Sequence, residues 1–564
     1  MSRIDPVTGA VIQGALESIA LEMGHKLMRM SYSSIIRESE DFGAALTDAT
    51  GQQMCECRMS TPLQSGPIPG YIRNVLKVLA EREDPVRPGD VIMHNDPYGG
   101  ASHGPDVAFC VPVFLGETLI GWSATTAHHL DIGALSPGSC GIVDAVDTYA
   151  EGLQFKAIKV FDQGMRNDAV WHILRANIRA TDLVVGDMEA QIEAARIGAA
   201  RLLGLVEQYG LDETMAAFHD LMDYSERLMR DAIRALPDGE YTASTMLDGY
   251  LDDPNPARRE LPLVVTLKVR GDSLTVDMTG TAPQVPDKPI NMPLVGTVDC
   301  SVWLTVRSIL LDTVRYGAIP QNSGLTRPIT IEAPEGTLVN PIFPAPVIAR
   351  FCPGNQLADT VMKAFAQIVP DQVSAGIGNL RVVALSGLRG GDHWVHMEIM
   401  EGSYGGRSGL DGMDAVDTLY ANTRNNPIED IESHIPIRVD RYELRENAVA
   451  AGQWRGGIGA IREFTFLDEA GFSLEGEGHA FKPWGFDGGE DGYEAELTLV
   501  HTDGSTTRLP SKVPYFKVKT GEKLVSTGPS GGGYGDPRRR DPKAIEDDIA
   551  DGLLSAATAK ASYG

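Results

Sequence analysis

Histidines and aspartates that could share one metal ion are concentrated in a short part of this chain. Four of the twelve histidines lie between residues 94 and 131, where an even spread would place about one. Aspartates are interleaved with them in the segment HNDPYGGASHGPDVAFCVPVFLGETLIGWSATTAHHLD. Two imidazoles and one carboxylate can hold a divalent metal while leaving positions open for water or substrate. The segment therefore indicates a candidate metal site.

His103 and Asp106 form a tight local pair on a loop bent by glycine and proline. His128 ends an apolar run that we expect to pair as an antiparallel strand with residues 107–114, which would bring His128 back beside that loop. Successive side chains alternate across a strand, so at most one of His128 and His129 is expected to bind metal. Residue types alone do not select a ligand set, because such residues are also common in turns and cores.

Other polar side chains near this segment are candidates to shape a pocket. Asp41 closes an acidic stretch after the first expected helix and could supply another oxygen. We expect His94 to be a hydrogen-bonding loop residue rather than a ligand. Asp96, His129 and Asp131 cannot be ranked from their positions in the sequence.

The remaining motifs argue against other chemistries. No GxxxxGK[ST] motif occurs, which excludes a P-loop at the level of sequence. The Gly-rich stretches 403–409 and 528–537 either line a pocket or bind an anion through backbone N–H groups, or they are tightly turning loops. Residues 528–532 match GxSxG, but no helical pattern follows them, so a nucleophile elbow is not expected. The six cysteines are scattered and predict reduced thiols rather than a zinc finger.

Length and composition describe a globular protein of several domains. The 564 residues correspond to about three to four domains. The net charge of −28 argues against binding nucleic acid or an anionic membrane surface. The apolar fraction of 43% is typical of a folded chain. No signal peptide or membrane span is expected, so we predict a cytoplasmic protein.

Hydrophobic periodicity predicts an α+β protein of mixed helices and strands, with a long central helical block and strand-rich middle and C-terminal portions. Helices are expected at residues 5–36, 68–82, 171–236, 295–311, 355–369 and 543–555. Strands are expected within 42–57, 85–148, 241–285, 373–399 and 448–527, with hairpin turns at 48–51 and 271–272. We predict four domains: 1–240 with the metal site and the helical block, 241–345 rich in strands, 346–440 with a Gly-rich loop, and 441–564 rich in strands.

Several motifs, in order along nearly the whole chain, resemble the hydantoinase B/oxoprolinase family. They are DPVTGAVIQGALESIALEMG, RESEDFG at 37–43, HNDPYGGASHGPD, TTAHHLDIGALSPGS, the NIR at 177–179 before a long helix, and TGPSGGGYGDP. The family includes the B-type subunits of ATP-dependent hydantoinases, 5-oxoprolinases and caprolactamase, and it is related to the α subunits of acetone and acetophenone carboxylases.

The resemblance implies a division of labour between two subunits. A hydantoinase A-type partner would use ATP to phosphorylate the substrate, which would explain why this chain lacks a P-loop. The metal ligands of the family fall on His103, Asp106 and His128, and Asp41 falls in its acidic motif as a fourth ligand or a base. The metal is expected to be Mn²⁺ or Zn²⁺, with Fe²⁺ less favoured. A hetero-oligomer such as α2β2 is expected.

On this basis we expect a hydrolytic subunit acting on a cyclic amide, namely a lactam, a hydantoin or 5-oxoproline. The proposed catalytic residues are Asp41, His103 and His128. Two alternatives stay open: a subunit of an ATP-dependent ketone carboxylase, and a non-catalytic scaffold with a structural metal. The modest length of the chain favours the cyclic amide.

Overall fold

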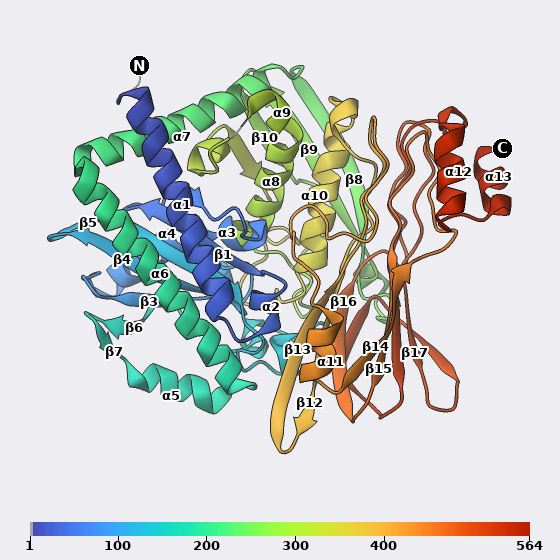
Figure 1. Ribbon diagram of the computed structural model, residues 1–564, viewed down its shortest axis with the longest axis horizontal. Helices are drawn as coiled ribbons and strands as arrows, with labels where there is room; N and C mark the ends of the chain where they lie inside the picture. Colours follow the sequence, from blue (N-terminus) through green and yellow to red (C-terminus); the bar gives the residue numbers. More distant parts are fainter. Residues whose placement is uncertain (1–3, 318) are drawn as a thin grey trace.

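A computed structural model describes residues 4–317 and 319–564 (Figure 1). Within these residues the strands form four separate sheets of seven, four, four and five strands. Most strand pairs are antiparallel, and β10 and β11 form a parallel pair. The predicted mixed class, with several sheets and several domains, is confirmed.

The N-terminal part is built around a seven-stranded sheet. Its strands, in spatial order, are β2 (Gln53–Glu56), β1 (Phe42–Asp48), β5 (Thr118–His128), β4 (Asp106–Leu115), β3 (Val91–His94), β6 (Ile158–Asp162) and β7 (Met165–Arg166). The predicted hairpin of β1 and β2 and the antiparallel pairing of β4 with β5 are both confirmed.

Helices cover both faces of this sheet. Helices α1 (Pro6–Met30) and α6 (Thr181–Tyr209) share a core with Phe42, Leu46 and Phe109. The helix predicted at 68–82 is confirmed as α4 (Ile68–Glu81), and it packs on the other face, against Ala45 and Trp122. Figure 1 shows α1 and α6 lying side by side across the sheet. Because both faces are covered, strand β1 is buried along its whole length.

The first helix is shorter than predicted. Instead of one helix over 5–36, α1 ends at Met30 and the short α2 (Ser34–Arg37) follows. Ser31 has an extended backbone with ψ 149°. The backbone N–H groups of Tyr32 and Ser33 donate to Asp187 of α6, at 2.6 and 3.2 Å. This long-range acceptor replaces the carbonyl partners that a continuing helix would offer, so the helix breaks there.

The central helical block is confirmed as three helices rather than one. They are α5 (Asp168–Asn177), α6 and α7 (Leu211–Arg234). Gly210 separates α6 from α7 with a φ of 85°, a conformation that favours glycine.

The middle part is a four-stranded sheet with two helices against it. Its strands are β11 (Ile329–Glu332), β10 (Ser273–Asp277), β9 (Glu260–Arg270) and β8 (Gly239–Asp248). The predicted hairpin between β9 and β10 turns at Gly271. Helices α8 (Asp299–Leu310) and α10 (Phe351–Phe365) share the core of this sheet. Helix α10 starts four residues before the predicted 355, because Pro353 fits the first turn, where its missing N–H is not needed.

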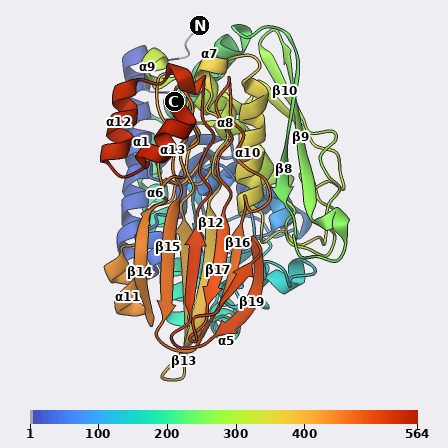
Figure 2. The ribbon, with the colours of Figure 1, turned by 90° about the vertical axis from the view of Figure 1, so that its right-hand side faces the viewer.

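The C-terminal part holds the other two sheets (Figure 2). One contains β13 (Asp392–Met400), β12 (Arg381–Arg389), β16 (Ala470–Gly476) and β19 (Lys512–Val518). The other contains β14 (Ile437–Leu444), β15 (Ala460–Phe466), β20 (Lys523–Thr527), β17 (Glu496–Val500) and β18 (Thr506–Leu509). The remaining helices are α3 (Pro62–Ser65), α9 (Thr313–Tyr316), α11 (Ile428–His434), α12 (Pro542–Ala550) and α13 (Ala556–Tyr563).

The two Gly-rich stretches pack against neighbouring backbone. A Cβ atom on Gly405 would lie 2.2 Å from the carbonyl oxygen of Ala375, and one on Gly532 would lie 2.1 Å from that of Trp484. Gly406 N also donates to Gly532 O at 2.8 Å. These glycines are therefore needed for close approach of backbone segments. Ser530, the serine of the GxSxG match, is fully buried and accepts a hydrogen bond from Gly459 N.

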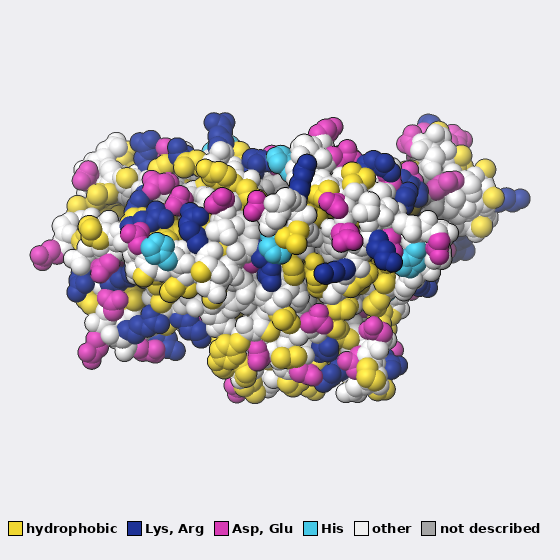
Figure 3. Space-filling view, turned by 90° about the horizontal axis from the view of Figure 1, so that it is seen from below, with side chains coloured by type: hydrophobic (Ala, Val, Ile, Leu, Met, Phe, Trp, Pro, Cys, Tyr) yellow, Lys and Arg dark blue, Asp and Glu magenta, His cyan; other side chains and the backbone are white. Residues whose placement is uncertain are grey.

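Three further findings concern membrane crossing, surface charge and the cysteines. Within the described residues, no helix has both the length and the apolar character needed to cross a membrane. On the face shown in Figure 3, basic and acidic side chains are interspersed rather than gathered into a basic stripe. All six cysteines are buried and have free thiols.

Candidate metal centre

The histidines and the aspartate meet because of strand register. Asp106 is the first residue of β4, His128 is the last residue of β5, and the two are direct partners across the antiparallel pair. His103 lies on the loop that leads into β4. The backbone N–H of Asp106 donates to the carbonyl of His103, which closes that loop into a turn. The expectation that His128 returns beside the 103–106 loop is confirmed.

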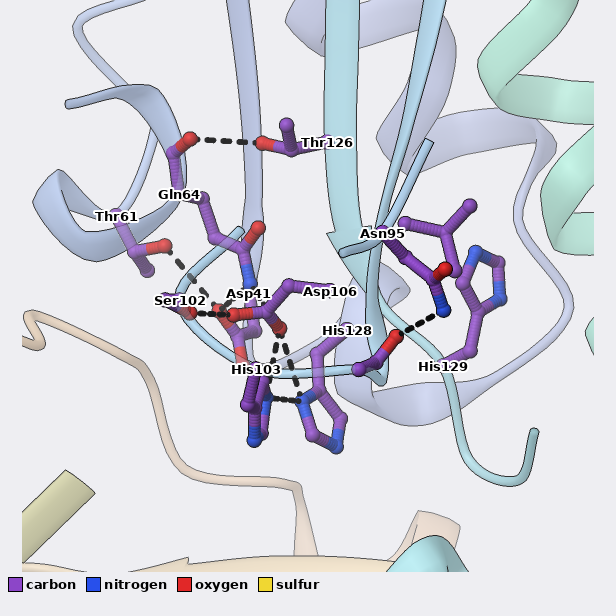
Figure 4. Close-up of polar contacts among 12 residues, drawn as sticks. Asp41, Thr61, Gln64, Asn95, Ser102, His103, Asp106, Thr126, His128 and His129 are labelled. Carbon is purple, nitrogen blue, oxygen red and sulfur yellow. Dashed lines mark hydrogen bonds and ion pairs between the residues drawn. The ribbon is translucent and has the colours of Figure 1, made fainter. Parts of the chain in front are cut away.

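Three donor atoms converge at this end of the sheet (Figure 4). His103 Nε2 lies 3.0 Å from Asp106 Oδ1, His128 Nδ1 lies 3.2 Å from the same oxygen, and the two ring nitrogens are 3.1 Å apart. All three residues are buried. Among the described residues they form a group that could hold a metal ion.

This triangle fits a divalent cation. Donor atoms about 2.1 Å from one metal, with bonds near right angles, lie about 3 Å apart, as in a facial two-histidine, one-carboxylate set. Ordinary hydrogen bonds do not account for all three contacts, because a neutral imidazole has a single N–H to share. Burial, and then the charge of Arg350, lowers the pKa of His103 to about 3, so its ring is neutral and can offer a lone pair.

The two oxygens of Asp106 have separate partners. Oδ1 faces the histidines and accepts from Gln64 Nε2 at 2.8 Å. Oδ2 accepts from Arg350 Nη2 at 2.9 Å and from the Ser102 hydroxyl. Burial favours the neutral acid, yet His103, His128 and Arg350 together hold the pKa of Asp106 well below its ordinary value. The group is therefore an oriented carboxylate, as a metal ligand must be.

Asp41 lies next to the converging donor atoms of His103, Asp106 and His128 but is not one of that group. Its Oδ1 accepts from Thr61 Oγ1 and from Gln64 Nε2, both at 3.2 Å. Burial raises the pKa of Asp41 to about 6. Gln64 therefore connects the carboxylates of Asp41 and Asp106. Asp41 does not belong to the group of three whose donor atoms lie within 4.8 Å of one another.

The other candidates from the sequence lie outside the centre and have their own partners. His94 Nε2 is 3.0 Å from Gly99 O, and its Nδ1 accepts from Ala157 N. His129 points to Gln191 of α6, at 2.8 Å, so the two neighbouring histidines face different sides as predicted. Asp131 pairs with Arg179 at 3.0 Å. Asp96 caps a turn at Tyr98 N and pairs with Lys156.

A small cavity adjoins the donor triangle and is closed by distant parts of the chain. Its volume is about 30 Å³, enough for one or two water molecules. Asp41, His103 and His128 line it. The lining also includes apolar side chains and a few polar ones from distant segments, among them Ile348, Phe351, Met397, Ile399, Ser473 and Glu475.

Sequence reasoning missed Arg350 and Gln64. Arg350 is 3% exposed and lies within the apolar stretch APVIARFCP. A single cation in such a stretch must be paired if it is buried, which is a signal that could have identified it. Gln64 has no comparable signal, because nothing in its local sequence separates it from a surface glutamine.

Together, the fold and the site define an α+β protein with a buried two-histidine, one-carboxylate centre at the end of its N-terminal sheet. The chain belongs to the hydantoinase B/oxoprolinase family, which matches residues 5–537.

Individual relatives show how far the similarity extends. The chain is 63% identical to a Pseudomonas sp. (strain NS671) protein named as a candidate B-type subunit of a D-/L-hydantoinase, covering all of this chain and 95% of the relative. The ATP-dependent caprolactamase of Pseudomonas jessenii matches with a TM-score of 0.89 at 29% identity, covering 100% and 96% of the two chains. A nucleotide-free acetone carboxylase matches with a TM-score of 0.91 at 17% identity, covering 99% and 79%, which shows a shared fold.

Proposed function

We propose that this chain is the hydrolytic, metal-binding subunit of an ATP-dependent cyclic amide hydrolase of the hydantoinase type. The observation that carries the proposal is the convergence of His103, Asp106 and His128 on one point beside a buried cavity. The 63% identity to a protein named as part of a hydantoinase supports the substrate class. The similarity to caprolactamase, named as ATP-dependent, supports the use of ATP.

The chemistry needs two subunits. An unactivated cyclic amide has a resonance-stabilised C–N bond and a poor nitrogen leaving group. An A-type partner would use ATP to phosphorylate the amide oxygen, which makes the ring carbon more electrophilic. The lack of a P-loop motif in this chain agrees with an ATP site on the partner. We expect a hetero-oligomer such as α2β2.

The residues of this chain would then prepare the attacking water. His103, Asp106 and His128 would hold Mn²⁺ or Zn²⁺, with Fe²⁺ less favoured, and such a cation lowers the pKa of water toward about 7. Asp41 lines the same cavity, and we assign it to orient the water and take its proton, a role worth about 10²–10⁴-fold in rate. Because the cavity is about 30 Å³, it must widen to admit a ring.

The test compares His103→Ala with the exposed His172→Ala, each copurified with the A-type partner. We expect His103→Ala to lose bound metal, measured by mass spectrometry, and ATP-dependent opening of hydantoins, measured by chromatography of the N-carbamoyl product. We expect His172→Ala to keep both. Full metal content and activity in His103→Ala would overturn the site.

The same preparation separates the alternatives. Product formation from ketones that depends on bicarbonate, without ring opening, would replace the hydrolase with a carboxylase, whose fold this chain shares. Unchanged turnover after exchange of the metal would point to a scaffold with a structural ion.

A further inference from the structure

Two acidic residues line the cavity at the candidate metal centre, Asp41 and Glu475. Glu475 lies on β16, which is hydrogen-bonded to β12 on one side and to β19 on the other, so its backbone is held firmly in place. The residue is 3% exposed. Because the cavity has room for one or two water molecules, the groups that line it lie close to the same reacting atoms.

One oxygen of Glu475 is fixed and the other is free. Oε1 accepts from the backbone N–H of Cys352 at 2.8 Å. The Cys352 thiol lies near the carboxyl but donates to Leu380 O at 3.4 Å, which leaves Oε2 without a donor among the described residues. Among the unpartnered polar atoms of the cavity wall, the Ser473 hydroxyl is fully enclosed and Glu475 Oε2 is not, so Oε2 is open to the cavity.

The two acidic residues have different surroundings. Asp41 accepts hydrogen bonds from two side chains, which favour its charged form, and its pKa of about 6 leaves it able to take a proton at neutral pH. Burial raises the pKa of Glu475, although the charges of Arg350 and Lys512 oppose the rise. Arg350 forms its ion pair with Asp106 rather than with Glu475. Glu475 is thus suited to give a proton and Asp41 to take one.

Opening of a phosphorylated cyclic amide needs a proton donor as well as a base. Water adds across the C=N bond of the phosphorylated ring: its hydroxide joins the carbon, and its other proton, carried by Asp41, joins the ring nitrogen. The carbon then holds a hydroxyl, the phosphoryl oxygen and the nitrogen. If the C–N bond breaks, its electron pair stays on nitrogen, which must receive a further proton, and the ring opens to an acyl phosphate. If the bond to the phosphoryl oxygen breaks instead, phosphate leaves with the electron pair and the closed ring is restored.

We propose that Glu475 Oε2 gives its proton to the ring nitrogen as the C–N bond breaks. The hydroxyl on the same carbon loses its proton to Asp41 as the C=O bond forms, and proton exchange with water restores both carboxyls. A second water then hydrolyses the acyl phosphate to a carboxylate and phosphate. This inference rests on the proposed hydrolase function and adds a catalytic residue to it.

A purely structural role for Glu475 is the competing explanation. Its Oε1 caps the first turn of α10 at Cys352 N, and glutamine keeps that oxygen. Glu475→Gln therefore preserves the cap and removes the proton. Glu151→Gln is the matched control: Glu151 is also buried and accepts from the backbone of Val347 and Ile348, but it does not line the cavity.

The experiment uses each variant copurified with the A-type partner and supplied with ATP and a hydantoin in water labelled with oxygen-18. It measures N-carbamoyl product, phosphate release, and the label in the recovered hydantoin. In Glu475→Gln we expect ring opening to fall about 100-fold or more, because nitrogen cannot leave without its proton. Phosphate release should continue, and label should enter the recovered hydantoin. The natural and Glu151→Gln complexes should couple phosphate release to ring opening and leave the recovered hydantoin unlabelled.

The outcomes separate a catalytic from a structural role. Bound metal, measured by mass spectrometry, should be unchanged in Glu475→Gln. The proposal is overturned if Glu475→Gln opens the ring as fast as the natural complex does, or if its ring opening and phosphate release fall together without label. Failure of the hydrolase function itself is a distinct result: the natural complex would then open no hydantoin with ATP, and the role of Glu475 would fall with it.

Discussion

At the scale of single residues, the candidate metal centre depends on side chains that orient its proposed ligands. Asp106 presents one oxygen to the histidines because Arg350 and Ser102 hold the other. Gln64 donates to Asp106 on the side of the histidines and reaches Asp41 as well. Substitution of a residue that orients a metal ligand typically lowers metal affinity about 10–100-fold.

Gln64→Leu should therefore weaken metal binding. The variant removes the donor shared by Asp41 and Asp106, and we expect Mn²⁺ or Zn²⁺ affinity to fall about 10–100-fold by calorimetry. Gln191→Leu is the matched control, because this buried glutamine contacts His129 and the carbonyl of Val107 instead. Equal affinity in the Gln64 and Gln191 variants would show that Gln64 does not support the centre.

At the scale of elements, close packing of helices on the N-terminal sheet brings β4 and β5 into place. Helix α6 approaches the sheet at Gly198, where an added Cβ would lie 2.3 Å from both Met23 Sδ and Ser123 Oγ. Gly43 has the same role in β1, because a Cβ there would lie 2.7 Å from backbone of Gln64. Small residues at these two points set the distances of α6 and α3 from the strands.

Two glycines of α6 give a matched prediction. Gly198→Ala should lower the free energy of unfolding by about 1–3 kcal/mol, because the buried contact is overpacked. Gly204→Ala, with no atom within 4 Å of the added carbon, should raise it by about 0.5–1 kcal/mol through better helix propensity. Urea denaturation of both variants checks the signs, and a gain in stability from Gly198→Ala would contradict the packing argument.

At the scale of the whole molecule, widely separated segments line the cavity at the candidate metal centre. Ile348 and Arg350 come from the segment before α10, and Ser473 and Glu475 come from β16. Glu475 accepts from the backbone N–H of Cys352 at 2.8 Å, which ties these two walls together. The four domain boundaries proposed from the sequence stay a prediction, but the cavity itself needs residues from the N-terminal, middle and C-terminal parts.

A buried carboxyl where α10 contacts the C-terminal part should make the free energy of unfolding depend on pH. Asp359 of α10 accepts from Trp484 Nε1 at 2.8 Å, and burial raises its pKa from 3.8 to about 6. Because the folded-state pKa is the higher one, this contribution to stability is full below pH 3.8 and is lost as pH rises through about 6. The loss amounts to about 3 kcal/mol.

Asp359→Asn should remove that dependence. We expect the difference in unfolding free energy between Asp359→Asn and the natural chain to change steadily from pH ~4 to pH ~7, measured by urea denaturation. The exposed Asp252→Asn should show no such trend. A pH-independent difference for Asp359→Asn would mean that this carboxyl does not titrate in the window.

The sequence by itself determined the local parts of this protein. The apolar run that ends at His128 was sufficient to predict its antiparallel pairing with residues 107–114 and its return beside His103 and Asp106. The sequence also predicted the helix at 68–82 and the hairpin turn at 271–272. These features depend on residues close together in the chain, so hydrophobic periodicity and turn residues are enough to predict them.

Only the tertiary structure decided the surroundings of that site. Asp187 breaks the first helix from 155 residues away, and Arg350 reaches Asp106 across 244 residues. Gln64 joins two carboxylates only because α3 lies close against Gly43. Such contacts depend on how helices and strands pack against one another and on which buried polar groups become partners. The hydrophobic periodicity of a single segment predicts neither of these.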